Sequence, residues 1–481
     1  MNIKEEYQRW CQLATDDADL VAELKAMDDV KMEDAFYREL EFGTGGLRGV
    51  IGAGTNRMNI YIIRKASQGV ANYIKNHFKP EERKIAISYD SRIKSDLFAR
   101  ESASVYAANG IKVYIYKELM PTPFASYATR ELACAGGVMV TASHNPSKYN
   151  GYKVYGADGC QITSEAAEEI TNEIGKTDAF NGVLRGNFDE YLNNGMIEYV
   201  SEELITAFIE RVKQESVLGN EKINKDIAII YTPLHGTGLK PVTRILRETG
   251  FTNVTVVKEQ EEPDGYFTTC PFPNPEIREA MQLGIEYAQR LNADLLLATD
   301  PDCDRVGIAV KDKDGDFQLL SGNQTGVLLL DFICQRRIAN GNMPAHPYFV
   351  KTIVTSDMAE AIGNYYGVEC FNVLTGFKYI GDTIANNLKN NPEKTYILGY
   401  EESYGYLSGS YVRDKDAVNG SFLIAEMFAW YKNKGVSLLD RLNELYAQFG
   451  YYLTTLDNFV FEGSAGFNKM KEIVANFKEN V

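Results

Sequence analysis

The sequence predicts an α/β protein of several domains, and two observations carry this prediction. The chain has 481 residues, which at roughly 150 residues per domain corresponds to about three domains. Short runs of β-branched and aromatic residues alternate with helical stretches of about a dozen residues, the pattern of βαβ units with mostly parallel sheets. Apolar residues make up 44% of the chain, so each domain can bury a core of its own.

The expected elements fall into three groups along the chain. The first group has strands at 84–90, 112–117 and 136–142 and a helix at 97–109 that Gly110 ends. The second has strands at 226–233, 253–258 and 294–299 and helices at 241–249 and 275–291. The third has strands at 348–355 and 395–399. A last fragment from residue 452 begins like a strand and continues as a Lys-rich helix.

Polar stretches separate these groups and set the expected domain limits. They lie at 181–203 and 340–347, and both are rich in Asn and Gly. We therefore expect domains at 1–205, 206–325 and 326–450, followed by a remainder at 451–481.

Charge and cysteine content narrow the class of function. The formal net charge is −16, which fits neither a nucleic-acid binder nor a protein held on an anionic membrane. The seven cysteines are single, as in reduced intracellular proteins. The N-terminus lacks the apolar segment of a secretory signal, and no apolar run reaches the roughly 18 residues that span a bilayer. We expect a cytoplasmic monomer or weak homodimer that binds a small molecule, not nucleic acid or membrane.

The segment Thr141–Pro146, TASHNP, directly follows the apolar strand GGVMV. A serine at the carboxyl end of a parallel strand sits where α/β proteins bind ligands, so Ser143 is a candidate nucleophile. The segment is not a GxSxG elbow. Adjacent side chains of an extended segment point in opposite directions, which argues against a hydrolase pair of Ser143 with His144. An Asn-Pro turn without a catalytic role is the alternative interpretation.

The segment Asp300–Arg305, DPDCDR, follows the strand ADLLLA and places three carboxylates at alternate positions. Such carboxylates repel one another unless a cation lies between them, and oxygen ligands favour Mg²⁺ or Ca²⁺. An EF-hand is excluded because its sixth position, which needs Gly, is Arg305, and its twelfth, which needs Glu, is Lys311. The alternative is a solvated acidic turn, which the guanidinium of Arg305 makes less attractive because it suits a phosphate oxygen.

Four further segments carry groups suited to a phosphorylated ligand. Phe42–Gly49, FGTGGLRG, permits close backbone approach and adds the guanidinium of Arg48, without a Walker pattern. Gly399–Gly405, GYEESYG, follows a strand and offers carboxylate and hydroxyl groups for sugar hydroxyls. Lys153 in NGYKVYG and Lys415 in VRDKDA add positive charge. Taken singly, the glycine-rich segment is equally compatible with a flexible turn, a segment such as GYEESYG is more often a polar turn, and a lone lysine in a strand is usually a surface residue.

Taken together and in this order, the segments resemble the α-D-phosphohexomutase family, closest to its phosphoglucomutase/phosphopentomutase branch. The matching segments are FGTGGLRG, YDSR, TASHNP, NGYKVYG, YTPLHGTG, PFPNPE, ATDPDCDR, LTGFKYIG, GYEESYG and VRDKDA, over about residues 40 to 420. TASHNP and DPDCDR are the most specific. The resemblance implies a deep cleft surrounded by four domains, three of them related α/β domains with mixed or parallel sheets, each giving a loop to one active site.

The resemblance also implies roles for individual residues. Ser143 would carry a phosphate and would contact Mg²⁺ together with three aspartates, Asp300, Asp302 and Asp304. The other catalytic residues would be Arg48, His144, Lys153 and Arg305. The substrate-binding residues would be Thr375, Gly376, Glu401, Ser403 and Lys415. Lys153 and His144 are both candidates for proton transfer, and Lys153 is preferred because it matches the family segment.

The implied activity is a phosphosugar mutase that interconverts glucose 1-phosphate and glucose 6-phosphate. It would use Mg²⁺ as cofactor and glucose 1,6-bisphosphate as activator and intermediate. The alternatives are the same chemistry on a pentose or mannose phosphate, a phosphosugar-binding protein without turnover and, third, a serine hydrolase. The binder is kept because the family's fourth domain carries a phosphate-clamping loop resembling R-x-S-G-T, which this sequence lacks. Residues 451–481 resemble the opening of that domain, so we expect a fourth domain that is mostly missing.

Overall fold

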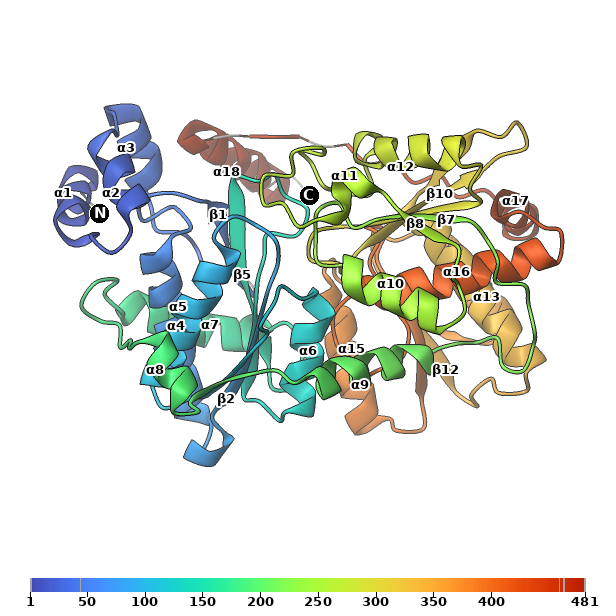
Figure 1. Cartoon of the computed structure of the whole chain (residues 1–481), viewed down its shortest axis with the longest axis horizontal. Helices are drawn as coiled ribbons and strands as arrows, with labels where there is room; N and C mark the ends of the chain where they lie inside the picture. Colours follow the sequence, from blue (N-terminus) through green and yellow to red (C-terminus); the bar gives the residue numbers. More distant parts are fainter. Residues whose placement is uncertain (1, 44, 458, 462, 480–481) are drawn as a thin grey trace.

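The computed structural model describes residues 2–43, 45–457, 459–461 and 463–479 and arranges them around three β-sheets (Figure 1). The sheets contain six, five and four strands and follow one another along the chain. Figure 1 shows the first sheet with its helices in blue and cyan on one side, and the other two sheets beside it. The α/β fold class is confirmed, whereas the limits near residues 205 and 325 stay predictions. Within the described ranges, no helix is long and apolar enough to cross a membrane.

The first sheet has the strand order β1-β5-β4-β2-β3-β6. Its strands are β1 (Gly46–Val50), β2 (Lys84–Tyr89), β3 (Lys112–Ile115), β4 (Gly136–Val140), β5 (Tyr149–Gly156) and β6 (Ile197–Tyr199). Strands β4, β2, β3 and β6 pair in parallel, whereas β5 pairs antiparallel with both β4 and β1. The predicted strands β2, β3 and β4 are confirmed. Each is one or two residues shorter than expected at its carboxyl end, where the chain leaves the sheet.

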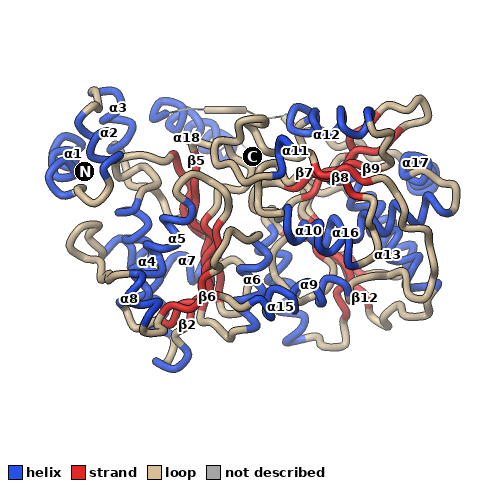
Figure 2. The backbone as a smooth tube through the Cα atoms, viewed as in Figure 1, coloured by secondary structure: helices blue, strands red, loops and turns tan. Residues whose placement is uncertain are grey.

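Helices cover both faces of the first sheet. The helices of this part of the chain are α1 (Ile3–Leu13), α2 (Ala18–Lys25), α3 (Asp29–Phe36), α4 (Ile60–His77), α5 (Ser95–Ala108), α6 (Thr122–Glu131), α7 (Ser164–Lys176) and α8 (Phe188–Asn193), with a 3₁₀ turn, η1 (Pro80–Glu82). Figure 2 shows α4, α5 and α7 on one side of the sheet and α6 on the side that faces the rest of the molecule. The predicted helix at 97–109 is confirmed as α5, and Gly110 follows its end with a φ of 73°.

The second sheet has the strand order β11-β10-β9-β7-β8. Its strands are β7 (Ile229–Thr232), β8 (Val254–Val256), β9 (Leu295–Thr299), β10 (Val306–Lys311) and β11 (Phe317–Leu320), and the helices around it are α9 (Glu202–Lys213), α10 (Leu239–Glu248), α11 (Lys258–Glu261) and α12 (Arg278–Arg290). Strands β8, β7 and β9 are parallel, and β10 and β11 add an antiparallel edge. The predicted helix at 275–291 begins only at Arg278, because Asn274 caps a turn by accepting the backbone N–H of Glu276.

The third sheet has the strand order β13-β12-β14-β15. Its strands are β12 (Pro347–Thr352), β13 (Glu369–Val373), β14 (Thr395–Tyr400) and β15 (Tyr406–Leu407), and the accompanying helices are α13 (Gly322–Ala339), α14 (Met358–Tyr366), α15 (Phe377–Asn390), α16 (Ala417–Asn433) and α17 (Leu438–Phe449). Strands β13, β12 and β14 are parallel, and β15 pairs antiparallel with β14. Each of the three sheets therefore has a parallel centre and antiparallel pairing at one edge.

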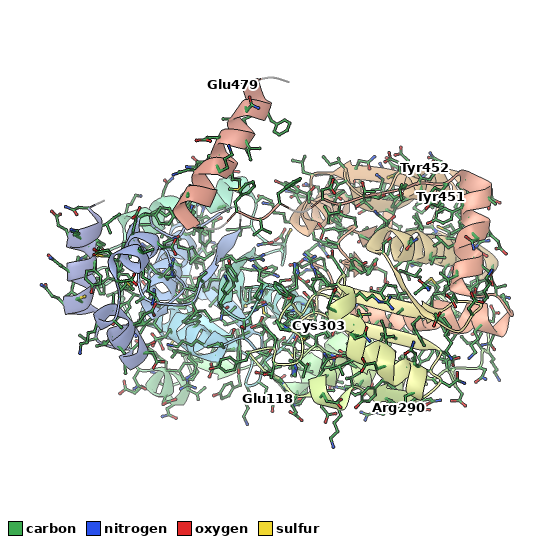
Figure 3. The ribbon with its side chains drawn as sticks, turned by 90° about the horizontal axis from the view of Figure 1, so that it is seen from above. Glu118, Arg290, Cys303, Tyr451, Tyr452 and Glu479 are labelled. Carbon is green, nitrogen blue, oxygen red and sulfur yellow. The ribbon has the colours of Figure 1, made fainter. Side chains whose placement is uncertain are left out.

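The remainder after α17 differs in part from the prediction. The Lys-rich helix is present as α18 (Gly463–Glu479), and Figure 3 shows it projecting from the body with Glu479 near its tip. The strand expected from residue 452 is wrong: residues 451–457 and 459–461 form no strand pairing in the described part of the chain. Leu453, Phe459 and Val460 are more than 70% exposed there. Alternating apolar residues form a stable strand only when a neighbouring strand and a core are available to them.

Helix α16 carries a buried carboxylate that makes stability depend on pH. Glu426 is 1% exposed; its Oε1 accepts a hydrogen bond from Ser216 Oγ at 2.7 Å, and its Oε2 has no partner among the described residues. Burial raises the pKa of Glu426 from 4.5 to about 6. The folded protein thus binds this proton more tightly than the unfolded chain, and stability falls as pH rises from about 4.5 to about 6.

The Glu426→Gln variant is expected to be more stable than the wild type above pH 6, because the amide keeps an acceptor for Ser216 and carries no charge to bury. The shift of the pKa corresponds to a gain of about 1–2 kcal/mol in the free energy of unfolding at pH 7.5. Urea unfolding at pH 7.5 and pH 4.5 measures it, with the exposed Glu393→Gln as the matched control. A gain that is equal at both pH values would contradict the assignment.

Candidate active site

Ser143 lies in the loop that leaves the carboxyl end of β4. Its Oγ is buried and donates a hydrogen bond to Asp300 Oδ2 at 3.0 Å. Asp300 directly follows β9 of the second sheet, so this bond joins the first two sheets. The backbone of Ser143 is in the left-handed region, with a φ of 53°. For a residue with a Cβ this costs on the order of 1–2 kcal/mol and persists only where the surroundings hold it. The candidate nucleophile is thus held in a strained turn against the aspartate segment.

His144 is closer to Ser143 than the sequence argument allowed. Its Nδ1 lies 3.4 Å from Ser143 Oγ. The expectation that the two side chains point apart assumed an extended segment, and it is wrong because Ser143 occupies a left-handed turn instead. Burial, followed by repulsion from the guanidinium groups of Arg305 and Arg48, lowers the pKa of His144 to about 2. The imidazole is therefore neutral near pH 7, and its low pKa makes it a weak base there.

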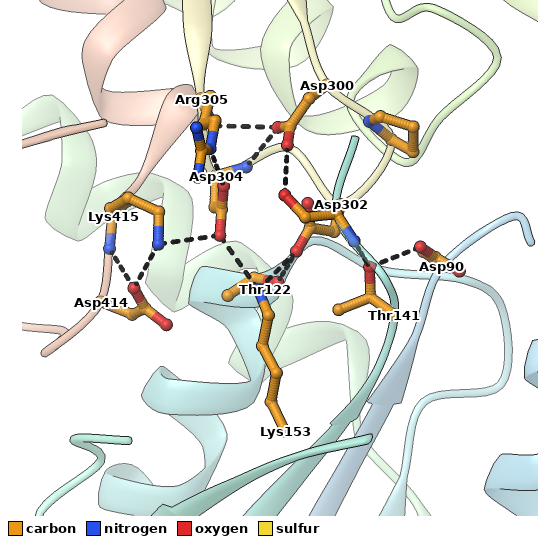
Figure 4. Close-up of polar contacts among 12 residues, drawn as sticks. Asp90, Thr122, Thr141, Lys153, Asp300, Asp302, Asp304, Arg305, Asp414 and Lys415 are labelled. Atoms are coloured by element: carbon orange, nitrogen blue, oxygen red, sulfur yellow. Dashed lines mark hydrogen bonds and ion pairs between the residues drawn. The ribbon is translucent and has the colours of Figure 1, made fainter. Parts of the chain in front are cut away.

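Asp300, Asp302 and Asp304 lie together in the turn between β9 and β10 (Figure 4). All three side chains are buried, and each offers a carboxylate oxygen within 4.8 Å of the others. Asp302 Oδ1 and Asp304 Oδ1 have no hydrogen-bond partner among the described residues. An unpaired buried carboxylate oxygen is costly, and a set of oxygen donors is what a hard divalent cation requires. The triad can therefore hold a metal ion.

Crowding of three carboxylates shifts their pKa values in different directions. Burial, followed by repulsion from Asp302 and Asp304, raises the pKa of Asp300 well above its ordinary range. Burial acts in the same sense on Asp302, but the neighbouring ammonium group of Lys153 outweighs it and holds the pKa of Asp302 below the ordinary value. A divalent cation between the carboxylates would favour their charged forms.

Two lysines from distant segments of the chain meet at the triad. Lys153, on β5, places its Nζ 2.8 Å from Asp302 Oδ2 and 3.2 Å from Asp304 Oδ2. Lys415, in the loop before α16, places its Nζ 3.1 Å from Asp304 Oδ2 and 3.0 Å from Asp414 Oδ1. Burial opposes the charge of Lys153, but the attraction of the aspartates outweighs it and raises the pKa of Lys153. Both lysines are thus cations at the edge of the triad (Figure 4).

The turn after β14 reaches the same place from the third sheet. The backbone carbonyl of Ser403 accepts a hydrogen bond from Arg305 Nη1 at 3.1 Å, and Glu276 Oε1 accepts another from the same nitrogen at 3.2 Å. Glu401 is buried, and its Oε1 accepts the backbone N–H of Gly376 at 3.1 Å. These bonds join the two predicted sugar-contacting turns to each other and to the guanidinium of Arg305.

A cavity of about 350 Å³ lies between these loops. Predicted site residues from all three sheets line it: Arg48, Ser143, Lys153, Asp304, Arg305, Thr375, Gly376, Glu401, Ser403 and Lys415. His144, Asp300 and Asp302 lie beside the cavity rather than in its wall. Arg48 is solvent-exposed on β1, with its Nη1 3.4 Å from Asn145 Oδ1. Thr44, in the same glycine-rich turn, lies outside the described residues.

Several residues of the site were not predicted from the sequence. Thr122, the first residue of α6, donates from Oγ1 to Asp302 Oδ2 at 2.7 Å and from its backbone N–H to the Asp302 carbonyl at 2.9 Å. Gln161 lines the cavity and donates to the carbonyl of Gly45 at 3.1 Å. The Pro-Thr-Pro sequence around Thr122 indicates a helix start but not its partner. Gln161 carries no sequence signal at all.

The fold and the site together define an α/β enzyme that works on phosphorylated compounds, since carboxylates for a cation, a buried hydroxyl and several cationic groups surround one cavity. Comparison with known proteins then gives the family. Three ranges match the domains described as phosphoglucomutase/phosphomannomutase, alpha/beta/alpha domains I, II and III, at residues 39–180, 206–315 and 321–449. The chain belongs to the phosphoglucomutase/phosphomannomutase family, that is, the α-D-phosphohexomutases, and is a phosphosugar mutase, an isomerase of phosphotransferase type.

Individual relatives agree with this assignment. The chain is 37% identical to the phosphoglucomutase of Staphylococcus saprophyticus over 443 residues, which are 92% of this chain and 79% of the relative. A phosphomannomutase-type structure from Thermus thermophilus is 25% identical, with a TM-score of 0.69 over 86% of this chain and 84% of that one. The open form of parafusin, a phosphoglucomutase from Paramecium, shares the fold at 18% identity and a TM-score of 0.64, over 86% of this chain and 75% of that one.

Proposed function

We propose that this chain interconverts glucose 1-phosphate and glucose 6-phosphate through a phosphorylated Ser143 and a bisphosphorylated sugar. The observation that carries the proposal is the contact of Ser143 Oγ with Asp300 Oδ2 at 3.0 Å, beside a cavity that also receives cationic side chains. The relatives from Staphylococcus are phosphoglucomutases, which supports glucose as the sugar. Glucose 1,6-bisphosphate would then serve both as the intermediate and as the compound that first loads the serine.

The chemistry requires two phosphoryl transfers at one place. In the first, the bond between phosphorus and Ser143 Oγ breaks while a bond to a sugar hydroxyl oxygen forms; the sugar hydroxyl loses its proton, and the serine oxygen gains one. The bisphosphorylated sugar then turns over, and its other phosphoryl group returns to Ser143 by the reverse exchange. Such transfers depend on in-line positioning and charge neutralisation more than on covalent help from the protein.

Two residues are candidates for the proton transfer between the sugar hydroxyl and the serine oxygen, His144 and Lys153. His144 lies 3.4 Å from the serine oxygen, but its pKa of about 2 makes the imidazole a weak base near pH 7. Lys153 lines the cavity and carries a proton that it can return to a leaving oxygen. The sequence resemblance favours Lys153 for proton transfer, and the place of Lys153 in the cavity wall supports that choice.

The aspartate turn fits Mg²⁺ as the ion of this site. Asp300, Asp302 and Asp304 would hold it together with an oxygen on Ser143, and the two orphaned buried carboxylate oxygens support this set. When bound, the ion supplies positive charge that offsets the charge of the phosphoryl oxygens. Oxygen ligands alone do not separate Mg²⁺ from Ca²⁺; the small number of protein ligands favours Mg²⁺, which keeps several waters of its own.

The cationic and sugar-contacting residues have separate tasks in this proposal. Arg305, Arg48 and Lys415 would offset the negative charge of the phosphate groups. Because the chain has a net charge of −16, this positive charge has to be supplied locally. Four polar groups from the third sheet would contact sugar hydroxyls: Thr375, Gly376, Glu401 and Ser403. Since both ends of the sugar must react at one Ser143, these contacts have to accept the sugar in two orientations.

An assay with several sugar phosphates tests the proposal. With Mg²⁺ and a catalytic amount of glucose 1,6-bisphosphate, glucose 1-phosphate is expected to be isomerised faster than mannose 1-phosphate or ribose 1-phosphate. Faster turnover of the ribose or mannose compound would mean that the preferred sugar is not glucose, while the proposed phosphoryl transfer through Ser143 would stand. Binding of glucose 1-phosphate without turnover, and without phosphate on the protein, would favour a phosphosugar-binding protein instead. The free thiols of all seven cysteines support a cytoplasmic setting for this activity.

A further inference from the structure

Two side chains fix the peptide groups on either side of Ser143. Thr141 Oγ1 accepts the backbone N–H of Ser143 at 2.8 Å and donates its own proton to Asp90 Oδ2 at 2.6 Å. Asp90 leaves the carboxyl end of β2, and its other oxygen accepts hydrogen bonds from Ser95 Oγ and from the backbone N–H of Arg92. In this series of hydrogen bonds, each group acts as a donor or an acceptor toward a defined partner. The backbone N–H of Ser143 is therefore held toward Thr141 Oγ1.

Arg92 holds the other side of the serine and the loop beyond it. Its Nη2 donates to the carbonyl oxygens of Ser143 and Asn145, and its Nη1 donates to those of Pro146 and Tyr149 at 3.0 Å each. The side chains of Arg92 and Asp90 are fully buried, with Nε and Oδ2 3.4 Å apart. One guanidinium therefore binds four carbonyl groups of the loop, which only a planar fork of donors can do.

The second sheet also contributes to this arrangement. The ring of Phe267, in the loop after α11, lies under the guanidinium of Arg92, with 4.9 Å between Cζ and the ring centroid. Any Cβ on Gly265 would lie within 3.0 Å of the backbone around Ser91 and Ile93, so the two loops are in close contact there. Arg92 is thus held between the serine loop and the domain that carries the aspartates.

We propose that Asp90, Arg92 and Thr141 are positioning residues that hold Ser143 in its left-handed conformation and so aim its oxygen at the aspartate turn. None of them needs to touch the moving phosphoryl group. This inference rests on the proposed function of Ser143 as the phosphorylated residue. Left-handed backbone at a serine relaxes unless both flanking peptide groups are held, and here Thr141 holds the N–H while Arg92 holds the carbonyl.

Replacing Thr141 by valine or by serine tests the role without removing a buried charge. Thr141→Val keeps the shape but removes both hydrogen bonds, whereas Thr141→Ser keeps them. The matched control is Thr129→Val on α6, equally buried, whose hydroxyl bonds only to the Ala125 carbonyl of its own helix. We expect Thr141→Val to slow phosphoryl transfer from the phosphorylated protein to glucose 1-phosphate by about 10- to 100-fold, with KM little changed. Thr141→Ser and Thr129→Val are expected to transfer at close to the wild-type rate.

Two further measurements separate positioning from general stability. Hydrogen exchange of residues 141–149 is expected to accelerate in Thr141→Val but not in Thr129→Val. Arg92→Lys, which keeps the charge beside Asp90 but loses the fork, is expected to accelerate exchange of this loop and slow transfer as well. A wild-type transfer rate in Thr141→Val would overturn the inference. So would a loss of rate in both Thr141→Val and Thr129→Val that is proportional to the drop in their unfolding temperatures. A wild-type protein that never takes up phosphate would instead overturn the proposed function and this role together.

Discussion

The Ser143→Ala variant is expected to lose turnover by on the order of 10⁴-fold or more, because it removes the oxygen that accepts and returns the phosphoryl group. Alanine has the same Cβ and the same cost of left-handed backbone as serine, so the loop is expected to keep its conformation. The lost hydroxyl bond to Asp300 affects one buried carboxyl whose pKa is already raised. The measurement is the rate of glucose 1-phosphate isomerisation beside the thermal unfolding temperature.

A matched control comes from the same loop. Ser147→Ala makes the identical change four residues further along, at a partly buried position, and is expected to keep activity within about threefold of the wild type, as surface changes usually do. Turnover by Ser143→Ala at a rate close to that of Ser147→Ala would remove Ser143 from the mechanism. Loss of activity in both, with a lowered unfolding temperature, would point to the loop's folding and not to its hydroxyl.

The Asp302→Asn variant is expected to bind Mg²⁺ about 100-fold more weakly or worse, because it replaces one of three carboxylates whose charge holds the ion. The side chain keeps its size, and one oxygen remains for the bonds from Thr122 and Lys153. Calorimetric titration of Mg²⁺ measures the affinity directly and does not depend on turnover. Activity is expected to fall with it and to return in part at high Mg²⁺.

The same variant can also be tested by measuring how much Mg²⁺ stabilises the fold. Free Mg²⁺ at about 100 times its dissociation constant is expected to stabilise the wild-type fold by roughly 2.7 kcal/mol and Asp302→Asn by far less. Asp314→Asn, an exposed aspartate in the turn between β10 and β11, is the control for the change of charge. Equal Mg²⁺ affinity in Asp302→Asn and the wild type would mean that the ion binds somewhere other than the aspartate turn.

The local parts of the site could be predicted because the residues that act together are close in the sequence. Asp300, Asp302 and Asp304 span five residues after an apolar strand, so their convergence follows from the turn itself. The position of Ser143 at the end of β4 follows in the same way from the strand before it. That these two turns share one site was implied by the family resemblance and not by spacing, since 157 residues separate Ser143 from Asp300.

The contacts that could not be predicted all join distant segments through buried polar groups. Thr122 binds Asp302 across 180 residues, and Arg92 binds carbonyl groups more than fifty residues away. A threonine at a helix start and an arginine after a strand are ordinary surface residues in most sequences. Their partners become visible only when the sheets are placed side by side, because hydrogen bonds to backbone carbonyls leave no pattern in the residues that own those carbonyls.

The wrong predictions share a physical cause as well. The strand expected at residue 452 has the residues of a strand but no neighbour to pair with in the described part of the chain, and alternation alone does not supply one. The first turn of the helix expected from Pro275 is replaced by a side-chain cap at Asn274. In both cases a local preference was real, and the contacts available to the segment decided the outcome.

The most direct test of the account is the mass of the intact protein after incubation with glucose 1,6-bisphosphate and Mg²⁺. One added phosphate per chain is expected, located on Ser143 by fragmentation. This phosphate is expected to be lost again when glucose 1-phosphate is added after the excess bisphosphate has been removed. Asp302→Asn is expected to load this phosphate slowly and Ser143→Ala not at all. A wild-type protein that isomerises glucose 1-phosphate while its mass never changes, or that carries the phosphate on another residue, would contradict the account.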